Sequence, residues 1–138
     1  MAALSADRIV RLKNIEGGKK QSALVASGVT IYKGGLCCYD ASGELIVPAD
    51  SASQKFAGLA LNGAVAGGRV ELYQHVEALL PCESDITVAD VETQVYCNDS
   101  GSVVSAATVS AACGVCKSIE ASGWAWVALN EVALPANS

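Results

Sequence analysis

Short runs of β-branched, aromatic and other apolar residues alternate along most of this chain with turns made of Asp, Ser, Asn and Gly. The first strong run covers residues 29–32, and others follow at 36–39, 45–47, 56–61 and 69–73. Asp and Ser side chains cap local backbone amides and Gly accepts positive φ, so these turns indicate hairpins. The pattern predicts an all-β domain of short antiparallel hairpins, closed as a small barrel or packed as a sandwich.

The same order of runs and turns occurs twice, which predicts a duplicated unit with copies at residues 31–73 and 93–130. Glycines mark the correspondence: Gly43 and Gly101 are 58 residues apart, and Gly58 and Gly114 are 56 apart. Such a small drift in offset is what short deletions in loops would produce. From the end of the first copy onward, apolar side chains recur at every second position over residues 70–80, with Gln74 as the one polar member. This alternation predicts one long strand at a sheet edge. Its end is set by Pro81, which cannot donate to a ladder.

Residues 1–28 differ from the rest and predict an extended N-terminal arm, which leaves residues 29–138 as the β-rich domain. The pair Gly17 and Gly18 lies in a polar stretch and indicates a flexible break. Residues 1–33 hold six of the nine bases and two of the fourteen acids, so they carry +4 and the remainder carries −9. The arm is therefore basic and the body acidic.

Composition narrows the class of protein. Only 17% of the residues are charged, against about 25% in typical soluble domains, which predicts a surface that is partly covered by other protein copies. The acidic, aromatic-poor body argues against a nucleic-acid module. The sequence has neither an apolar run long enough for a membrane span nor a recognisable signal peptide, so we expect no membrane partner and synthesis in a cytoplasm.

The residue pattern resembles that of tailed-phage capsid decoration, or cement, proteins, a family of small β domains encoded near phage capsid genes. The resemblance covers roughly residues 30–130 and rests on five features of the sequence. These are the run 56–61, the glycine turn that ends at Gly68, the phrase 85–90, the turn 95–101 and the closing run 124–127. The cysteines and the paired tryptophans depart from the Val- and Ala-rich pattern of that family, and residues 1–28 are not matched.

The resemblance implies a non-enzymatic virion protein, usually a trimer, on the outside of an icosahedral shell where capsid subunits meet. The expected partners are the major capsid protein and further copies of this chain, and the expected location is the outer capsid surface. No cofactor or metal is expected. A phage tail or fibre accessory domain is the alternative structural role.

Two sets of residues are predicted to make these contacts. The unmatched basic arm is expected to order on the capsid, with its bases facing acidic patches and its apolar residues in grooves. The predicted arm contacts are Arg8, Val10, Arg11, Leu12, Lys13, Lys19 and Lys20. Aromatic residues are enriched at interface hot spots, so the candidates for subunit contact, with core packing as the other interpretation, are Trp124, Trp126 and Tyr73.

A thiol-based redox or zinc module is the alternative from a different class, because Cys113 and Cys116 form a CxxC motif. The flanking residues read as extended, and residues i and i+3 of a strand point to opposite faces. Two further zinc ligands would also have to come from elsewhere in the fold. We therefore expect buried structural cysteines. The single histidine, His75, lacks a recognisable nucleophile nearby in sequence and is expected on a solvated or interface face.

Overall fold

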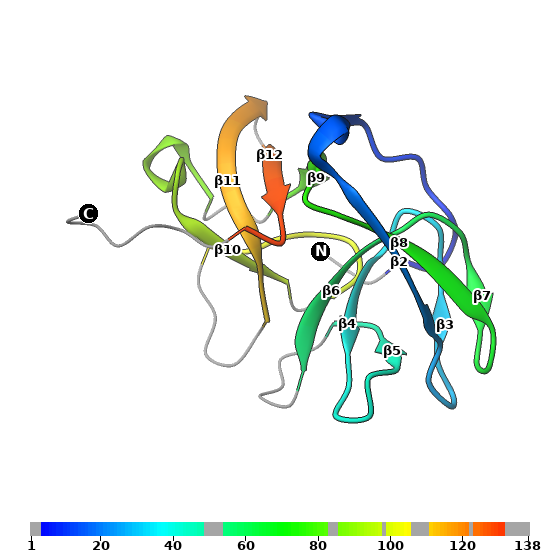
Figure 1. Ribbon diagram of the computed structural model, residues 1–138. Coiled ribbons are helices and arrows are strands. Elements are labelled where there is room, and N and C mark those ends of the chain that lie inside the picture. Colours follow the sequence, from blue (N-terminus) through cyan, green and yellow to red (C-terminus); the bar gives the residue numbers. More distant parts are fainter. Residues whose placement is uncertain are drawn as a thin grey trace.

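The computed structural model describes residues 4–48, 54–82, 86–97, 99–105, 111–121 and 123–131. Within these ranges the chain forms two five-stranded antiparallel sheets, a two-stranded ribbon and two short 3-10 turns. The two large sheets pack against each other as a sandwich (Figure 1). The predicted all-β class is confirmed, and of the two predicted closures the sandwich is the one observed.

Each large sheet has a simple strand order. Sheet A contains, in spatial order, β1 (Leu12–Lys13), β9 (Glu77–Pro81), β12 (Trp124–Leu129), β11 (Ala111–Ala121) and β10 (Gln94–Cys97). Sheet B contains β2 (Lys19–Leu24), β8 (Arg69–Gln74), β6 (Lys55–Ala60), β4 (Leu36–Tyr39) and β5 (Leu45–Ile46). The ribbon pairs β3 (Thr30–Ile31) with β7 (Ala64–Val65), and the 3-10 turns are η1 (Ile15–Gly17) and η2 (Val88–Asp90).

The chain crosses between the sheets at two adjacent points. One crossing is His75, which has a φ of 60° and separates β8 in sheet B from β9 in sheet A. The other follows η1, where a β carbon on Gly18 would lie 2.5 Å from Val76 Cγ1. The strand predicted over residues 70–80 is therefore broken in two, and neither half is an edge. β8 lies between β2 and β6, and β9 lies between β1 and β12.

The strand pairings in the two halves of the chain correspond to each other. Cys37 pairs with Gly58 in sheet B, and Val95 pairs with Gly114 in sheet A, and a register shift follows immediately in both ladders. Single hydrogen bonds recur as well: Gly34 N–H donates to Ala60 O at 2.9 Å. Its counterpart, Glu92 N–H, donates to Cys116 O at 2.6 Å. The repeated order of strands thus reflects two units with the same internal topology.

The duplication begins earlier in the chain than the sequence pattern predicts. The β2–β8 pair in sheet B corresponds to the β9–β12 pair in sheet A. Each residue of β2 lies 57 positions before its counterpart in or next to β9. In each unit, the residue after the first strand also forms a parallel bridge with the segment that follows the Asp-containing turn. These bridges join Val25 to Leu45 in the first unit and Cys82 to Val103 in the second. The first unit therefore spans residues 19–74 and the second residues 77–129.

Residues 1–28 do not form a separate arm in the part of this segment that the structure describes. Leu12 and Lys13 pair with β9, and β2 is a full strand of sheet B. The sequence interpretation failed because Gly17 and Gly18 look like a flexible linker. In the fold, Gly18 is required because the chain passes close to Val76 at the crossing.

The core is continuous between the two units. One buried cluster combines Leu36, Cys38 and Leu59 of the first unit with many residues of the second, including Val95 and Leu129. A smaller cluster fills the remainder of the first unit around Leu45, Val70 and Leu72. Side chains from the two sheets therefore pack into each other and fix the relative position of the two units.

Candidate functional site

Arg8 anchors the N-terminal segment to the body of the protein. Its half-buried guanidinium donates from Nε to Gly34 O at 2.8 Å and from Nη1 to Gly101 O at 2.7 Å. Burial lowers the pKa of Arg8 below its ordinary value, and the nearby Asp99 carboxylate opposes that shift. Arg8 was predicted to face a capsid patch, but its donors are already used within the chain.

Val10 and Leu12, predicted to occupy capsid grooves, instead pack against the core cluster shared by the two units. Leu12 also pairs with Ala78 of β9. Apolar side chains next to an incomplete sheet edge gain more from covering their own core than from staying exposed. These two residues are therefore structural in the isolated chain.

Arg11 and Lys13 cover the indole of Trp126. The Lys13 ammonium lies 4.2 Å from the ring centroid and the Arg11 guanidinium 5.7 Å from it. The indole Nε1–H donates to Glu120 Oε1 at 2.7 Å, and Trp126 is only 6% exposed. The two bases and Trp126, predicted to bind different partners, thus bind each other. Trp124, in contrast, is 45% exposed.

The remaining predicted bases lie on β2, which is one of the two edge strands of sheet B. The side chains of Lys19 and Lys20 are exposed, and the Lys20 ammonium lies 5.5 Å from the centroid of the half-buried Tyr73 ring. Leu24 at the other end of the strand is 40% exposed. We call the outer side of Lys19–Leu24 the basic edge. Of the predicted residues, Lys19 and Lys20 lie on this edge, and Tyr73 lies beside it on β8.

A shallow depression of about 630 Å³ adjoins the basic edge, between β2 and the turn that joins β4 to β5. Its walls include Ser22, Leu24, Tyr39, Glu44 and Arg69. Arg69 Nη1 donates to Ser22 Oγ at 3.1 Å. Sequence reasoning missed Arg69 and Tyr39, because only the β2–β8 pairing and the position of the turn bring them to this edge. Sequence reasoning also missed β2 itself, because its residues show no alternation of apolar and polar side chains.

All six cysteines are buried, and those of the CxxC motif lie on the extended strand β11, as predicted. Cys38, Cys97 and Cys113 belong to the same buried cluster between the sheets. Cys97 Sγ donates to Ala111 O at 3.8 Å, and Cys113 Sγ donates to Val95 O at 3.6 Å. The side-chain interaction with Cys97 is the largest cause that raises the pKa of Cys38, and burial is the second. Burial is the main cause that raises the pKa of Cys37. These thiols are held protonated, which disfavours thiolate chemistry.

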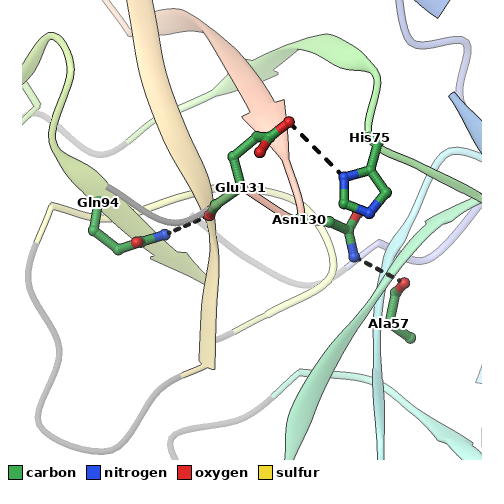
Figure 2. Close-up of polar contacts among 5 residues, drawn as sticks. All are labelled: Ala57, His75, Gln94, Asn130 and Glu131. Atoms are coloured by element: carbon green, nitrogen blue, oxygen red, sulfur yellow. Dashed lines mark hydrogen bonds and ion pairs between the residues drawn. The ribbon is translucent and has the colours of Figure 1, made fainter. Parts of the chain in front are cut away.

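His75 belongs to a polar cluster at the junction of the two units (Figure 2). His75 Nδ1 lies 3.8 Å from Glu131 Oε1, and Asn130 Nδ2 donates to Ala57 O at 3.3 Å. His75 and Asn130 follow equivalent strands of the two units, and both have positive φ, 60° and 65°. The His75 and Glu131 side chains are 39% and 53% exposed, so this contact contributes little to stability. The cluster connects the end of the second unit to the corner between the sheets.

Within the described ranges, no group of three or more His, Cys, Asp or Glu side chains is arranged to hold a metal ion. No helix in the same ranges is long and apolar enough to cross a membrane. Comparisons with family models, curated proteins and solved structures find no significant match to this chain. The basic edge with its depression is the surface feature that best fits a functional site.

Proposed function

We propose that this chain is a non-enzymatic virion protein that binds the outer surface of a phage capsid and holds adjacent major capsid subunits together. The observation that carries the proposal is the basic edge: a full-length sheet edge with two exposed lysines beside a depression. Edge strands are ready templates for pairing with another chain. The resemblance of the sequence to capsid decoration proteins supplies the identity of the partner.

The contact surface differs from the arm that the sequence suggested. Arg8, Arg11 and Lys13 contact residues of the second unit. Lys19 and Lys20 are the predicted bases that lie on the edge strand, where Lys20 also contacts the Tyr73 ring. They project from a strand of a packed sandwich. A binding strand that is already ordered loses less conformational entropy on association than a disordered arm does.

Stabilisation of the capsid follows from linkage. A protein that binds the assembled lattice and not its separated subunits shifts the equilibrium toward the lattice by mass action. We propose that a homotrimer acts at each site, because three linked contacts raise the effective affinity without any new interaction. The exposed Trp124 is the aromatic residue we assign to the contact between copies, since Trp is enriched at such interfaces.

The test is co-sedimentation with purified expanded heads that lack this chain, prepared from the phage that encodes it. The double variant Lys19→Glu and Lys20→Glu should bind about tenfold more weakly or not at all, because reversed charges at an interface repel. Lys33→Glu with Lys55→Glu makes the same change in net charge at exposed positions off the basic edge and should bind as the wild type does. Failure of the wild type to bind heads would refute the proposal.

A further inference from the structure

The first strands of the two units differ in what lies on their outer side. In the second unit, the outer side of β9 is covered by the N-terminal segment of the chain: Lys13 lies opposite Glu77, and Leu12 lies opposite Ala78. The Leu79 N–H donates to Arg11 O at 2.9 Å. In the first unit, the equivalent strand is β2. Among the described residues, the pairing on its outer side is limited to the bridge from Val25, just past its end, to Leu45 of β5, so residues 19–22 have no partner strand there.

The backbone groups of β2 are set for such a partner. The Val25 N–H donates to Gly68 O at 2.9 Å, which is on the β8 side of the strand. The ladder with β8 has no register shift, and the N–H groups of alternate residues point to opposite sides. The N–H of Ser22, three residues before Val25, therefore points away from β8. Ser22 is also the counterpart of Leu79 at the 57-residue offset, so this N–H corresponds to the one that Arg11 O accepts in the second unit.

The depression occupies the space that the N-terminal segment fills in the second unit. There, the same segment that pairs with β9 reaches the turn at residues 99–102, where Arg8 Nη1 donates to Gly101 O and Leu4 N–H to Ser100 Oγ. The counterpart of that turn in the first unit, at residues 40–44, forms one wall of the depression. The first unit thus presents an unfilled version of a groove that the second unit fills with an extended segment.

The charge on the edge indicates which kind of segment fits. In the second unit the edge residue is Glu77, and the covering strand places Lys13 opposite it. The counterpart of Glu77 in the first unit is Lys20, and Lys19 precedes it. Opposite charges on directly paired residues stabilise an antiparallel ladder, and like charges destabilise it. The strand that fits β2 carries a carboxylate opposite Lys20.

We infer that the basic edge binds an extended acidic segment of the capsid partner, which adds to sheet B as an antiparallel strand along β2 and enters the adjacent depression. This is strand addition, in which main-chain hydrogen bonds supply affinity and side-chain contacts supply specificity. The inference rests on the proposed function for the identity of the partner. The geometry of the site rests on the internal duplication alone.

The test uses two synthetic peptides with the sequence of residues 4–14, the segment that fills the groove of the second unit. One keeps that sequence, and the other has Glu in place of Arg8, Arg11 and Lys13. The full-length protein should bind the acidic peptide about tenfold more tightly than the basic one, because the side chain opposite Lys20 changes from like to opposite charge. Fluorescence anisotropy of the labelled peptides measures both affinities.

Two protein variants with a matched control locate the binding. Lys20→Glu should reverse the preference between the peptides. Ser22→Pro removes the outward N–H while leaving the ladder to β8 intact, and should abolish binding of the acidic peptide. Ser22→Ala keeps that N–H, loses the same hydroxyl contact with Arg69, and should bind as the wild type does. If Ser22→Pro does not fold, the reversal by Lys20→Glu decides the question alone.

The outcomes separate this inference from the proposed function. Heads bound by a wild-type protein that binds neither peptide would overturn strand addition on β2 and leave capsid binding intact. Equal affinity for both peptides, or no change with Lys20→Glu, would also overturn it. A second copy of this chain is the other possible occupant of the β2 edge, and sedimentation of the protein alone tests for it. If the mass drops to that of the monomer with Ser22→Pro but not with Ser22→Ala, then β2 pairs with a second copy.

Discussion

At the scale of single residues, the basic side chains of the N-terminal segment divide into two groups. Arg8, Arg11 and Lys13 contact residues of the second unit, whereas Lys19 and Lys20 lie on the edge strand of sheet B, where Lys20 also contacts the Tyr73 ring. The division cannot be read from charge or spacing, because all five lie within one short basic stretch. It depends on which carbonyls and rings the fold brings near each side chain.

The guanidinium of Arg8 is expected to contribute to folding. Arg8→Ala leaves Gly34 O and Gly101 O without their donor, and an unsatisfied buried acceptor costs about 1–3 kcal/mol of unfolding free energy. Lys19→Ala, an exposed change in the same segment, should alter the unfolding free energy by less than about 0.5 kcal/mol. Urea denaturation of both variants measures the difference, and equal values would mean that the Arg8 contacts are not formed.

The buried thiols predict a loss of stability at alkaline pH. The pKa values of Cys37, Cys38 and Cys97 are raised in the folded protein, by burial or by side-chain interactions with neighbouring thiols. The unfolded chain therefore loses these protons at lower pH than the folded chain does. Stability from the thiols is fully present below the ordinary cysteine pKa of 9.0 and falls as pH rises above it. The slope is about 1.4 kcal/mol per pH unit for each thiol.

Urea denaturation at pH 7, 9 and 10.5 measures this slope, with Cys97→Ala as the comparison. The variant is less stable at every pH because it leaves a cavity, but its stability should decline less steeply above pH 9 because it has one thiol fewer to titrate. Parallel declines in the wild type and the variant would show that Cys97 does not contribute to the alkaline loss.

At the scale of secondary-structure elements, each unit has a glycine at an equivalent position, Gly58 or Gly114, where a neighbouring strand comes close. A β carbon on Gly58 would lie 2.6 Å from Tyr73 O, and one on Gly114 would overlap the Ala128 carbonyl oxygen. Tyr73 and Ala128 occupy corresponding positions on β8 and β12. A register shift lies next to each glycine in the ladder with the strand on its other side. The close approach of the β8 or β12 backbone leaves no space for a side chain at either glycine.

Gly58→Ala and Gly114→Ala should therefore each destabilise the protein by about 1–3 kcal/mol, the usual cost of overpacking. The matched control is Ala112→Ser on the exposed face of β11, which should change the unfolding free energy by less than about 0.5 kcal/mol. Thermal denaturation compares the three variants. Large loss at one glycine and none at the other would contradict the structural equivalence of the two units.

The sequence predicted those elements whose signals are local. The turn at Asp40 is an example, since Asp40 Oδ1 accepts the N–H groups of Ser42 and Glu44, contacts that lie within a few residues. The β2 strand was missed because its only buried residue is Ala23, so it shows no alternation of apolar and polar side chains. The break at His75 was missed because the alternation of buried and more exposed side chains continues on both sides of it. The two strands nevertheless belong to different sheets.

The site itself depends on pairings between distant segments, which explains why only part of it was predicted. Lys19, Lys20 and Tyr73 were named from charge and aromatic character, and the β2–β8 ladder brings them together. The same criteria also selected Val10, Leu12 and Trp126, whose surroundings are their own core and their own N-terminal segment. Residue type indicated candidates, and strand order determined which of them remain at the surface.

At the scale of the whole molecule, the two units form a single packed body. The cluster that unites Leu36 and Leu59 with Val95 and Leu129 crosses the boundary between them. The basic edge therefore has a fixed position relative to the exposed Trp124 on the other sheet. In the account proposed here, one of these surfaces meets the capsid and the other meets further copies of the chain, which agrees with the low proportion of charged residues.

The most direct test of capsid decoration is electron imaging of phage heads assembled with and without this chain, combined with its copy number by quantitative mass spectrometry. The account predicts regular density on the outside of the shell that disappears in heads lacking the chain, with hundreds of copies per particle. Heads of identical appearance in the two preparations, or only a few copies confined to the tail, would contradict it.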